Sequence, residues 1–196
     1  SSAIYGDFGD EMIHESIGPL LPISNYGAMK LASEAQISAA CEGFLKRANI
    51  FRFPNVVGVP ATHGVILDFI NKLLLNKNEL QVLGNGTQQK AYLHVSDLID
   101  AMLLISNQQI DSKVEVINIG PFDKGVTVKW IAQEVVNKIN PSAKIVYGVG
   151  NKGWVGDVPK FNYSVEKLKS LGWSPILGSE KAVKRAINEI IIQLGL

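Results

Sequence analysis

Helix-like and strand-like segments alternate along this chain of 196 residues, and the alternation constrains its fold more than any other feature. Runs of good helix formers are separated by runs rich in β-branched and aromatic residues. We expect helices at 25–47, 64–76, 96–108, 127–140, 164–173 and 179–196, and strand segments at 48–60, 80–95, 113–120 and 143–150. Ser24 and Ser96 are expected to cap two of these helices. The order of segments predicts an α/β fold with parallel strands.

The composition is that of an ordinary globular protein, with 46% apolar residues, 19% charged residues and a net charge of +1. No basic stripe indicates a nucleic-acid partner, and no apolar run reaches the about 18 residues of a membrane span. The single cysteine, Cys41, excludes an internal disulfide and fits a reducing compartment, so we expect a cytoplasmic protein. His63 and His94 lack metal-ligand spacing, and we expect no metal site.

Tyr26 and Lys30, in "YGAMK", stand one helical turn apart at a predicted helix start and therefore share one face. A nearby ammonium favours the phenolate and lowers the pKa of a tyrosine, which is otherwise about 10. Such a pair can act as a general base. Tyr163 and Lys167 repeat the spacing, but their surroundings, "KFNYSVEKLKSLGW", are typical of an ordinary surface helix. The flanks of the first copy, "PISNYGAMK" and then "RFPNVVG", favour it as the functional one.

Six landmarks succeed one another in the chain: "SSAIYGD", "PISNYGAMK", "RFPNVVG", "GNGTQQKAYLHVSDL", "VINIG" and "GWVGDVP" with "KLKSLGW". In this order they resemble the extended short-chain dehydrogenase/reductase family, specifically its NAD-dependent nucleotide-sugar epimerases and dehydratases. The resemblance implies an α/β fold that is the C-terminal part of a Rossmann-like parallel sheet with a smaller substrate-binding lobe. Residues 1–60 would belong to the NAD-binding Rossmann domain and 61–196 mainly to the lobe, with 92–120 returning to the Rossmann domain.

The resemblance also implies residue roles in catalysis and in binding of the cofactor, NAD. Tyr26 would take the proton from the sugar hydroxyl, while Lys30 would lower the pKa of Tyr26 and hold the cofactor ribose. Ser1 matches the catalytic Ser/Thr that hydrogen-bonds the reacting oxygen, and Pro54 would lie against the nicotinamide. Ser1, Tyr26, Lys30 and Pro54 are therefore the implied cofactor-binding residues.

A UDP-sugar substrate is implied as well, held by Ser2, Asn55, Val65, Gln81, Leu83, Lys90, Trp154 and Phe161. Lys90 and Trp154 stand where the family usually has Arg. Lysine keeps the charge but loses the bidentate fork, and Lys152 is a candidate substitute for the second arginine. From the residues alone, Asn55 would be a turn former. Asp97 is expected in the first turn of a helix and not as a catalytic acid.

A dinucleotide-binding enzyme of this class needs a glycine-rich turn between a strand and a helix. The chain has one literal match, "GVGNKG" at 148–153. Pro159 comes where the helix would run, so we do not expect this match to bind the pyrophosphate. The sequence therefore resembles roughly the C-terminal 60% of a full enzyme, either as a fragment or as a truncated gene product. We expect these 196 residues alone to bind NAD poorly.

Dehydratases of the family carry Asp-Glu directly after the catalytic Thr, where this chain has Ser2 and Ala3, which cannot supply the acid and base. We therefore expect an NAD-dependent 4-epimerase that interconverts UDP-glucose and UDP-galactose. The alternatives are another nucleotide-sugar reductase of the family and a truncated, non-catalytic sugar-nucleotide-binding relative. A homodimer through the Tyr-bearing helix is expected, because Ala32, Ala35 and Ala39 permit close helix approach.

Overall fold

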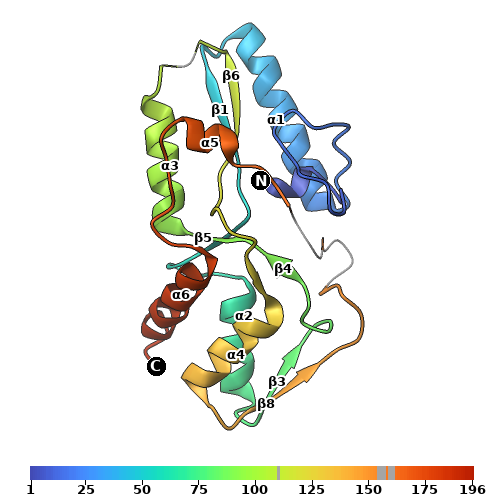
Figure 1. Cartoon of the computed structure of the whole chain (residues 1–196), viewed down its shortest axis with the longest axis vertical. Coiled ribbons are helices and arrows are strands. Elements are labelled where there is room, and N and C mark those ends of the chain that lie inside the picture. The colour runs from blue at the N-terminus through green and yellow to red at the C-terminus, as the bar shows by residue number, and fades with distance from the viewer. Residues whose placement is uncertain (110, 154–157, 159–161) are drawn as a thin grey trace.

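The computed structural model describes residues 1–109, 111–153, 158 and 162–196, which form two packed bodies joined by short strands (Figure 1). The helices are the 3-10 turn η1 (Ser2–Ile4), α1 (Asn25–Gly43), α2 (Val65–Leu75), α3 (Val95–Asn107), α4 (Val128–Ile139), α5 (Glu166–Ser170) and α6 (Ser179–Gln193). The strands are β1 (Ala48–Arg52), β2 (Asn55–Val57), β3 (Glu79–Val82), β4 (Gln89–Lys90), β5 (Tyr92–His94), β6 (Val114–Asn118), β7 (Val126–Thr127) and β8 (Lys144–Tyr147).

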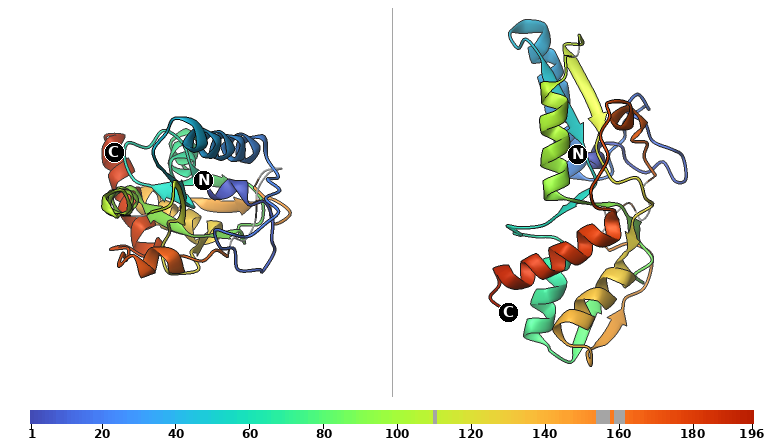
Figure 2. Two further views of the ribbon diagram at one scale, coloured as in Figure 1. Left: turned by 90° about the horizontal axis from the view of Figure 1, so that it is seen from above. Right: turned by 60° about the vertical axis from the view of Figure 1, so that its left-hand side comes forward.

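The first body is built on β1 and β6, which pair in parallel from Ala48 opposite Val114 to Arg52 opposite Asn118. Helices α1 and α3 lie on opposite sides of this pair (Figures 1 and 2). Buried apolar residues between β6, α3 and α5 form its core. The parallel pairing confirms the predicted α/β class. Helix α5 packs against β6 and so also lies with this body, beyond the predicted segment 92–120.

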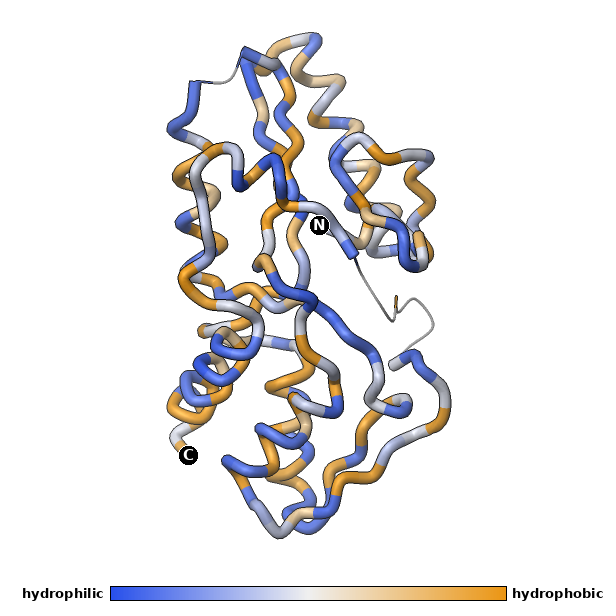
Figure 3. Tube along the Cα trace, in the orientation of Figure 1, coloured by the Kyte–Doolittle hydropathy of each residue, from blue (hydrophilic) through white to orange (hydrophobic). Residues whose placement is uncertain are grey.

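The second body packs α2, α4 and α6 together, with the parallel pair β3–β8 at its end. Its core is supplied by one face of each helix, and Figure 3 shows hydrophobic and hydrophilic residues alternating along them. In α2 the buried residues are Ile66, Phe69, Ile70 and Leu73, which recur at helical spacing. The short pairs β2–β5 (parallel) and β4–β7 (antiparallel) connect the bodies, and β5 contacts α6.

Several predicted boundaries differ from the structure. The prediction of Ser96 as a helix cap is wrong: α3 is capped by His94, whose Nδ1 accepts from the Ser96 backbone N–H (3.2 Å). The first long helix ends at Gly43 and not at residue 47, with Phe44 as its C-cap. The last helix ends at Gln193, before Gly195 at φ +72°. None of the helices in the described part of the chain combines the length and the hydropathy of a membrane-spanning segment.

Candidate active site

The serine turn, Ser1 to Ile4, closes against the end of strand β1. Ser1 caps η1, because its Oγ accepts from the backbone N–H of Ala3 (3.3 Å). The backbone nitrogen of Ser1 donates to Phe51 O (3.1 Å), and that of Ser2 donates to Phe53 O (3.1 Å). Both serines are therefore held at the carboxyl end of a parallel strand, the edge at which α/β proteins bind their ligands.

Tyr26 lies in the first turn of α1 and is 56% exposed. Lys30 comes one turn later, with Nζ 5.5 Å from the centroid of the Tyr26 ring. The predicted cap is confirmed, since Ser24 Oγ accepts from the backbone N–H of Gly27 (3.1 Å). The helix thus presents a phenol and an ammonium side by side, close enough for a cation–π interaction.

Gly27 brings the serine turn and α1 together. A Cβ at this buried glycine would lie 2.4 Å from the carbonyl oxygen of Ala3 and 2.9 Å from Pro22 Cβ. Only a residue without a side chain allows η1 to touch the helix there, so Gly27 sets the spacing between the serines and Tyr26. Sequence reasoning missed this residue. A usable signal existed, because glycine early in a helix costs stability and calls for a packing reason.

The second Tyr-x-x-x-Lys copy has a different geometry, and the surface helix predicted there forms only over Glu166–Ser170, so that Tyr163 lies before it. Tyr163 precedes α5, forms a β-bridge with Ile13, and donates from Oη to Ile119 O (2.9 Å). Lys167, on α5, forms an ion pair with Glu115 of β6. The tyrosine and the lysine turn to separate partners, so this copy lacks the side-by-side arrangement seen in α1.

A buried polar network around Tyr5, which follows the serine turn, joins the turn to α1 and β6. Arg52, only 5% exposed, forms an ion pair with Glu34 of α1 (2.8 Å). Its Nη1 also donates to Tyr5 Oη (3.1 Å), and Tyr5 Oη donates to Asn118 Oδ1 (2.6 Å). Burial raises the pKa of Tyr5 against the opposing effect of Arg52, so its phenol stays a protonated donor. The network therefore holds Tyr5, and with it the serine turn, against α1, β1 and β6.

The serine turn lines a cleft of about 980 Å³. Eight of the predicted site residues line it: Ser1, Ser2, Tyr26, Pro54, Asn55, Val65, Leu83 and Lys90. His63 and Lys72 line it as well, and Lys72 is paired with Asp68 (2.7 Å). Asp68 lines the cleft too, so the described lining carries two lysines against one aspartate, and this small positive excess suits an anionic ligand.

The remaining predicted site residues lie elsewhere. Lys30 stands beside Tyr26 but is not among the described residues that line the cleft. Gln81, on β3, is exposed and donates from Nε2 to Glu79 Oε1 (3.2 Å). Trp154 and Phe161 fall outside the described residues. Asp97 is a buried residue that accepts from the Leu177 backbone N–H (2.9 Å), and its predicted position in the first turn of a helix is confirmed.

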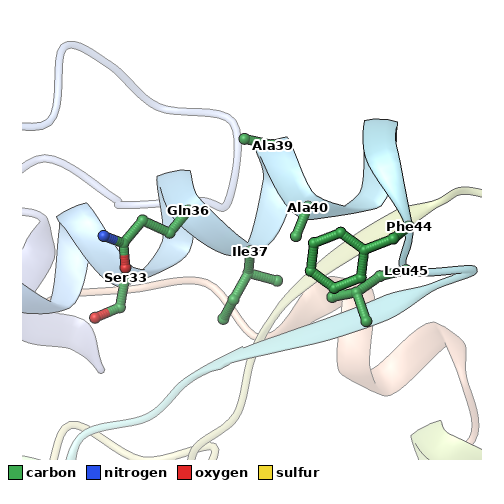
Figure 4. Close-up of a pocket in the computed structure, with 7 residues that line it drawn as sticks. All are labelled: Ser33, Gln36, Ile37, Ala39, Ala40, Phe44 and Leu45. Atoms are coloured by element: carbon green, nitrogen blue, oxygen red, sulfur yellow. The ribbon is translucent and has the colours of Figure 1, made fainter.

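A second hollow lies on α1 and the loop after it (Figure 4). It is lined by Ser33, Gln36, Ile37, Ala39, Ala40, Phe44 and Leu45. None of these side chains titrates near neutral pH, so this hollow offers no acid–base chemistry. Within the described parts of the chain, no group of three or more His, Cys, Asp or Glu side chains is placed to hold a metal ion.

Comparison with known proteins agrees with this geometry. The profile of the NAD-dependent epimerase/dehydratase family matches residues 1–120. A protein of Methanocaldococcus jannaschii named "Putative UDP-glucose 4-epimerase" is 28% identical over 190 residues, which are 95% of this chain and 59% of that protein. The dTDP-D-glucose 4,6-dehydratase of Mus musculus is 24% identical over 189 residues, 94% of this chain and 52% of that protein. The chain thus spans between half and two thirds of these relatives.

Solved structures give the same result. A crystal structure of UDP-galactose 4-epimerase superposes with a TM-score of 0.85 at 36% identity, covering 99% of this chain and 62% of that chain. MoeE5 in complex with UDP-glucuronic acid and NAD superposes with a TM-score of 0.81 at 26% identity, covering 100% and 64%. The matched profile covers more than half of the sequence, and the fold agrees along its length. The chain therefore belongs to the NAD-dependent epimerase/dehydratase family.

Proposed function

We propose that this chain forms the catalytic and substrate-binding part of an NAD-dependent nucleotide-sugar 4-epimerase that interconverts UDP-glucose and UDP-galactose. One observation carries the proposal. The two hydroxyls of the serine turn and the phenol of Tyr26 line the same cleft, and Lys30 Nζ lies 5.5 Å from the centroid of the phenol ring. This is the set of groups that removal of a proton from a sugar hydroxyl requires.

In the proposed mechanism Tyr26 accepts the proton of the sugar 4-hydroxyl. Ser1 donates a hydrogen bond to the same oxygen, and the Lys30 ammonium stabilises the phenolate form of Tyr26 that accepts the proton. NAD, when bound, supplies the hydride acceptor. Tyr26, Lys30, Ser1 and Pro54 are the residues that would hold it, and three of them share the cleft, with Lys30 one turn along the helix. Their hydroxyl, ammonium and apolar groups fit a ribose and a nicotinamide ring.

The cleft also has chemistry that suits a nucleotide-sugar. Asn55 and Lys90 line it, and an amide with an ammonium is a suitable pair for the diphosphate. Leu83 offers an apolar surface at another part of the cleft wall, where a base can lie. The relatives are named for reactions of UDP-glucose or dTDP-D-glucose, and the solved structure of MoeE5 is a complex with UDP-glucuronic acid and NAD.

Epimerisation is preferred over dehydration because of the two residues after Ser1. Elimination of water needs an additional acid and base, and neither the hydroxyl of Ser2 nor the methyl of Ala3 titrates in the working range. Family membership alone does not make this choice, since a 4,6-dehydratase is also among the relatives. The residues of the serine turn support the epimerase.

The test is a coupled assay that measures conversion of UDP-galactose to UDP-glucose by the full-length gene product in the presence of NAD. Tyr26→Phe should lower kcat by about 10²- to 10⁴-fold, the usual contribution of a general base. Its affinity for UDP should stay unchanged, which serves as the internal control. Full activity in Tyr26→Phe would contradict the mechanism. Consumption of NADPH with a keto-sugar, without epimerisation, would indicate a reductase instead.

A homodimer through α1 forms part of the proposal. Met29 and Phe44 are 71% and 82% exposed on this helix and just after it, and Ala39 lines the neighbouring hollow. Small and apolar side chains of this kind allow two helices to pack closely. Sedimentation equilibrium should give a dimer, and Phe44→Glu should shift it toward the monomer.

Buried Cys41 fits the proposed cytoplasmic location, which a fluorescent fusion would test.

A further inference from the structure

Tyr163 lies where three segments meet. Its backbone joins Ile13 in a β-bridge in which Ile13 N donates to Asn162 O (2.8 Å) and Ser164 N donates to Ile13 O (2.7 Å). Its side chain packs both on the core of the first body and on the small cluster that contains Ile4. The same residue lines the cleft. Tyr163 therefore stands between the serine turn, the end of β6 and the ligand space.

The Tyr163 ring is held in one position, here called its seat, by Ile119 and Gly120. Its Oη donates to Ile119 O (2.9 Å). A Cβ at Gly120 would lie 2.1 Å from the same Oη and 2.9 Å from Cζ, so the ring fits only because residue 120 is glycine. The hydrogen bond and the close approach of Gly120 both hold the hydroxyl end of the ring, and the apolar packing on two clusters holds the rest of the side chain.

The chemistry of this phenol differs from that of Tyr26. Burial, then the nearby Tyr5 and Asp123, raise the pKa of Tyr163 well above its usual value, so the phenol stays protonated at all working pH. Its proton is directed to the Ile119 carbonyl. Tyr163 is thus an uncharged wall residue and cannot serve as a second base.

Position along the cleft indicates which part of a ligand meets Tyr163. The cluster on which it packs contains Ile4 and Tyr5, which come directly after the serines and Ala3. Leu83 and Gln88, which also line the cleft, lie after β3 in the second body. Tyr163 is therefore at the end of the cleft where the proposed reaction takes place, and not at the end proposed for the base.

We propose that Tyr163 is a specificity-determining and positioning residue for the sugar, whose seated ring forms the cleft wall beside the serine turn. The inference rests on the proposed function. In this arrangement Ile119 and Gly120 act through Tyr163, and the wall fixes the depth at which the sugar sits relative to Tyr26. Tyr163 is not one of the substrate contacts that the family resemblance implies.

Two variants of the full-length gene product test this in complementary ways. Tyr163→Phe keeps the ring and removes the bond to Ile119 O, while Gly120→Ala keeps the tyrosine and displaces it from its seat. Dissociation constants for UDP and for UDP-glucose are measured by calorimetry. Tyr163→Phe frees the ring from Ile119, and we expect it to weaken UDP-glucose binding by up to about fivefold, the most that one lost internal hydrogen bond can pass on, with UDP binding unchanged. Gly120→Ala should weaken UDP-glucose binding at least as much.

The matched control is Tyr147→Phe, the same change on β8 at a residue that is not among those described as lining the cleft. It should leave both constants unchanged. Equal ratios of UDP-glucose to UDP affinity in wild type and Tyr163→Phe would overturn the inference while leaving the proposed function intact. If Gly120→Ala fails to fold, Tyr163→Phe decides alone. A wild-type protein that binds neither ligand would overturn the proposed function and this inference with it.

Discussion

At the scale of single residues, the candidate site depends on a glycine, which has no side chain, as much as on residues with functional side chains. Tyr26 and Lys30 could be predicted because both lie on one helix, where spacing alone fixes their relation. Gly27 acts by having no Cβ against the Ala3 carbonyl, which belongs to η1 and not to α1. The contact joins two elements, and periodicity within one element does not show it.

Replacing Gly27 by alanine should therefore separate the serine turn from α1. Its Cβ would lie 2.4 Å from Ala3 O, and we expect overpacking to cost about 1–3 kcal/mol and to lower kcat. Gly43→Ala, in the same helix, is the matched control, since its Cβ would meet nothing within 4 Å. Urea denaturation and the epimerase assay measure the two effects. Equal stability and activity in both variants would show that Gly27 does not set the spacing.

At the scale of elements, α1 is attached to β1 by one buried ion pair. The single Nε–H of Arg52 is shared between the two carboxylate oxygens of Glu34, and Arg52 Nη2 donates to Glu34 Oε2. The order of helices and strands could be predicted from periodicity, but this attachment could not. Glu34 looks like any acidic residue on a helix, and the burial of Arg52 depends on how Tyr5 and Asn118 meet it from distant parts of the chain.

Glu34→Gln should destabilise the protein by about 3 kcal/mol, because it leaves the buried Arg52 charge without its partner. Glu42→Gln is the control on the same helix. Glu42 pairs with Lys113, and the two side chains are 74% and 58% exposed, so this change should cost about 0–1 kcal/mol. Chemical denaturation of both variants provides the comparison. A similar loss in both would mean that the Arg52 pair is no stronger than a surface pair.

At the scale of the whole molecule, two carboxylates tie late segments of the chain to earlier ones. Glu115 pairs with Lys167 of α5, and Glu189 of α6 contacts His94 Nε2 (3.0 Å). Burial works against both carboxylates. The hydrogen bonds from Lys167 and Ser112 nevertheless lower the pKa of Glu115, and those from His94 and Arg185 lower the pKa of Glu189.

These shifts make stability depend on pH in the acid range. Because the folded pKa lies below the unfolded value of 4.5, the unfolded chain binds more protons there. The stabilisation is complete above that value and is lost as pH falls through the lowered folded pKa. Urea denaturation from pH 7 downward should show the loss, and Glu189→Gln should reduce its slope. An unchanged slope in that variant would exclude Glu189 as a source.

The bridge between Ile13 and Tyr163 has a consequence for how the protein is made. The side chain of Asn162 donates to Asp10 O across 152 residues of sequence, so this junction closes a very long loop. Contacts so distant in sequence cannot form until the ribosome has synthesised both partners. Closing the loop also costs chain entropy before the contacts contribute any stability. During synthesis, the segment after the serine turn therefore has no bridge partner until more than a hundred further residues have been synthesised.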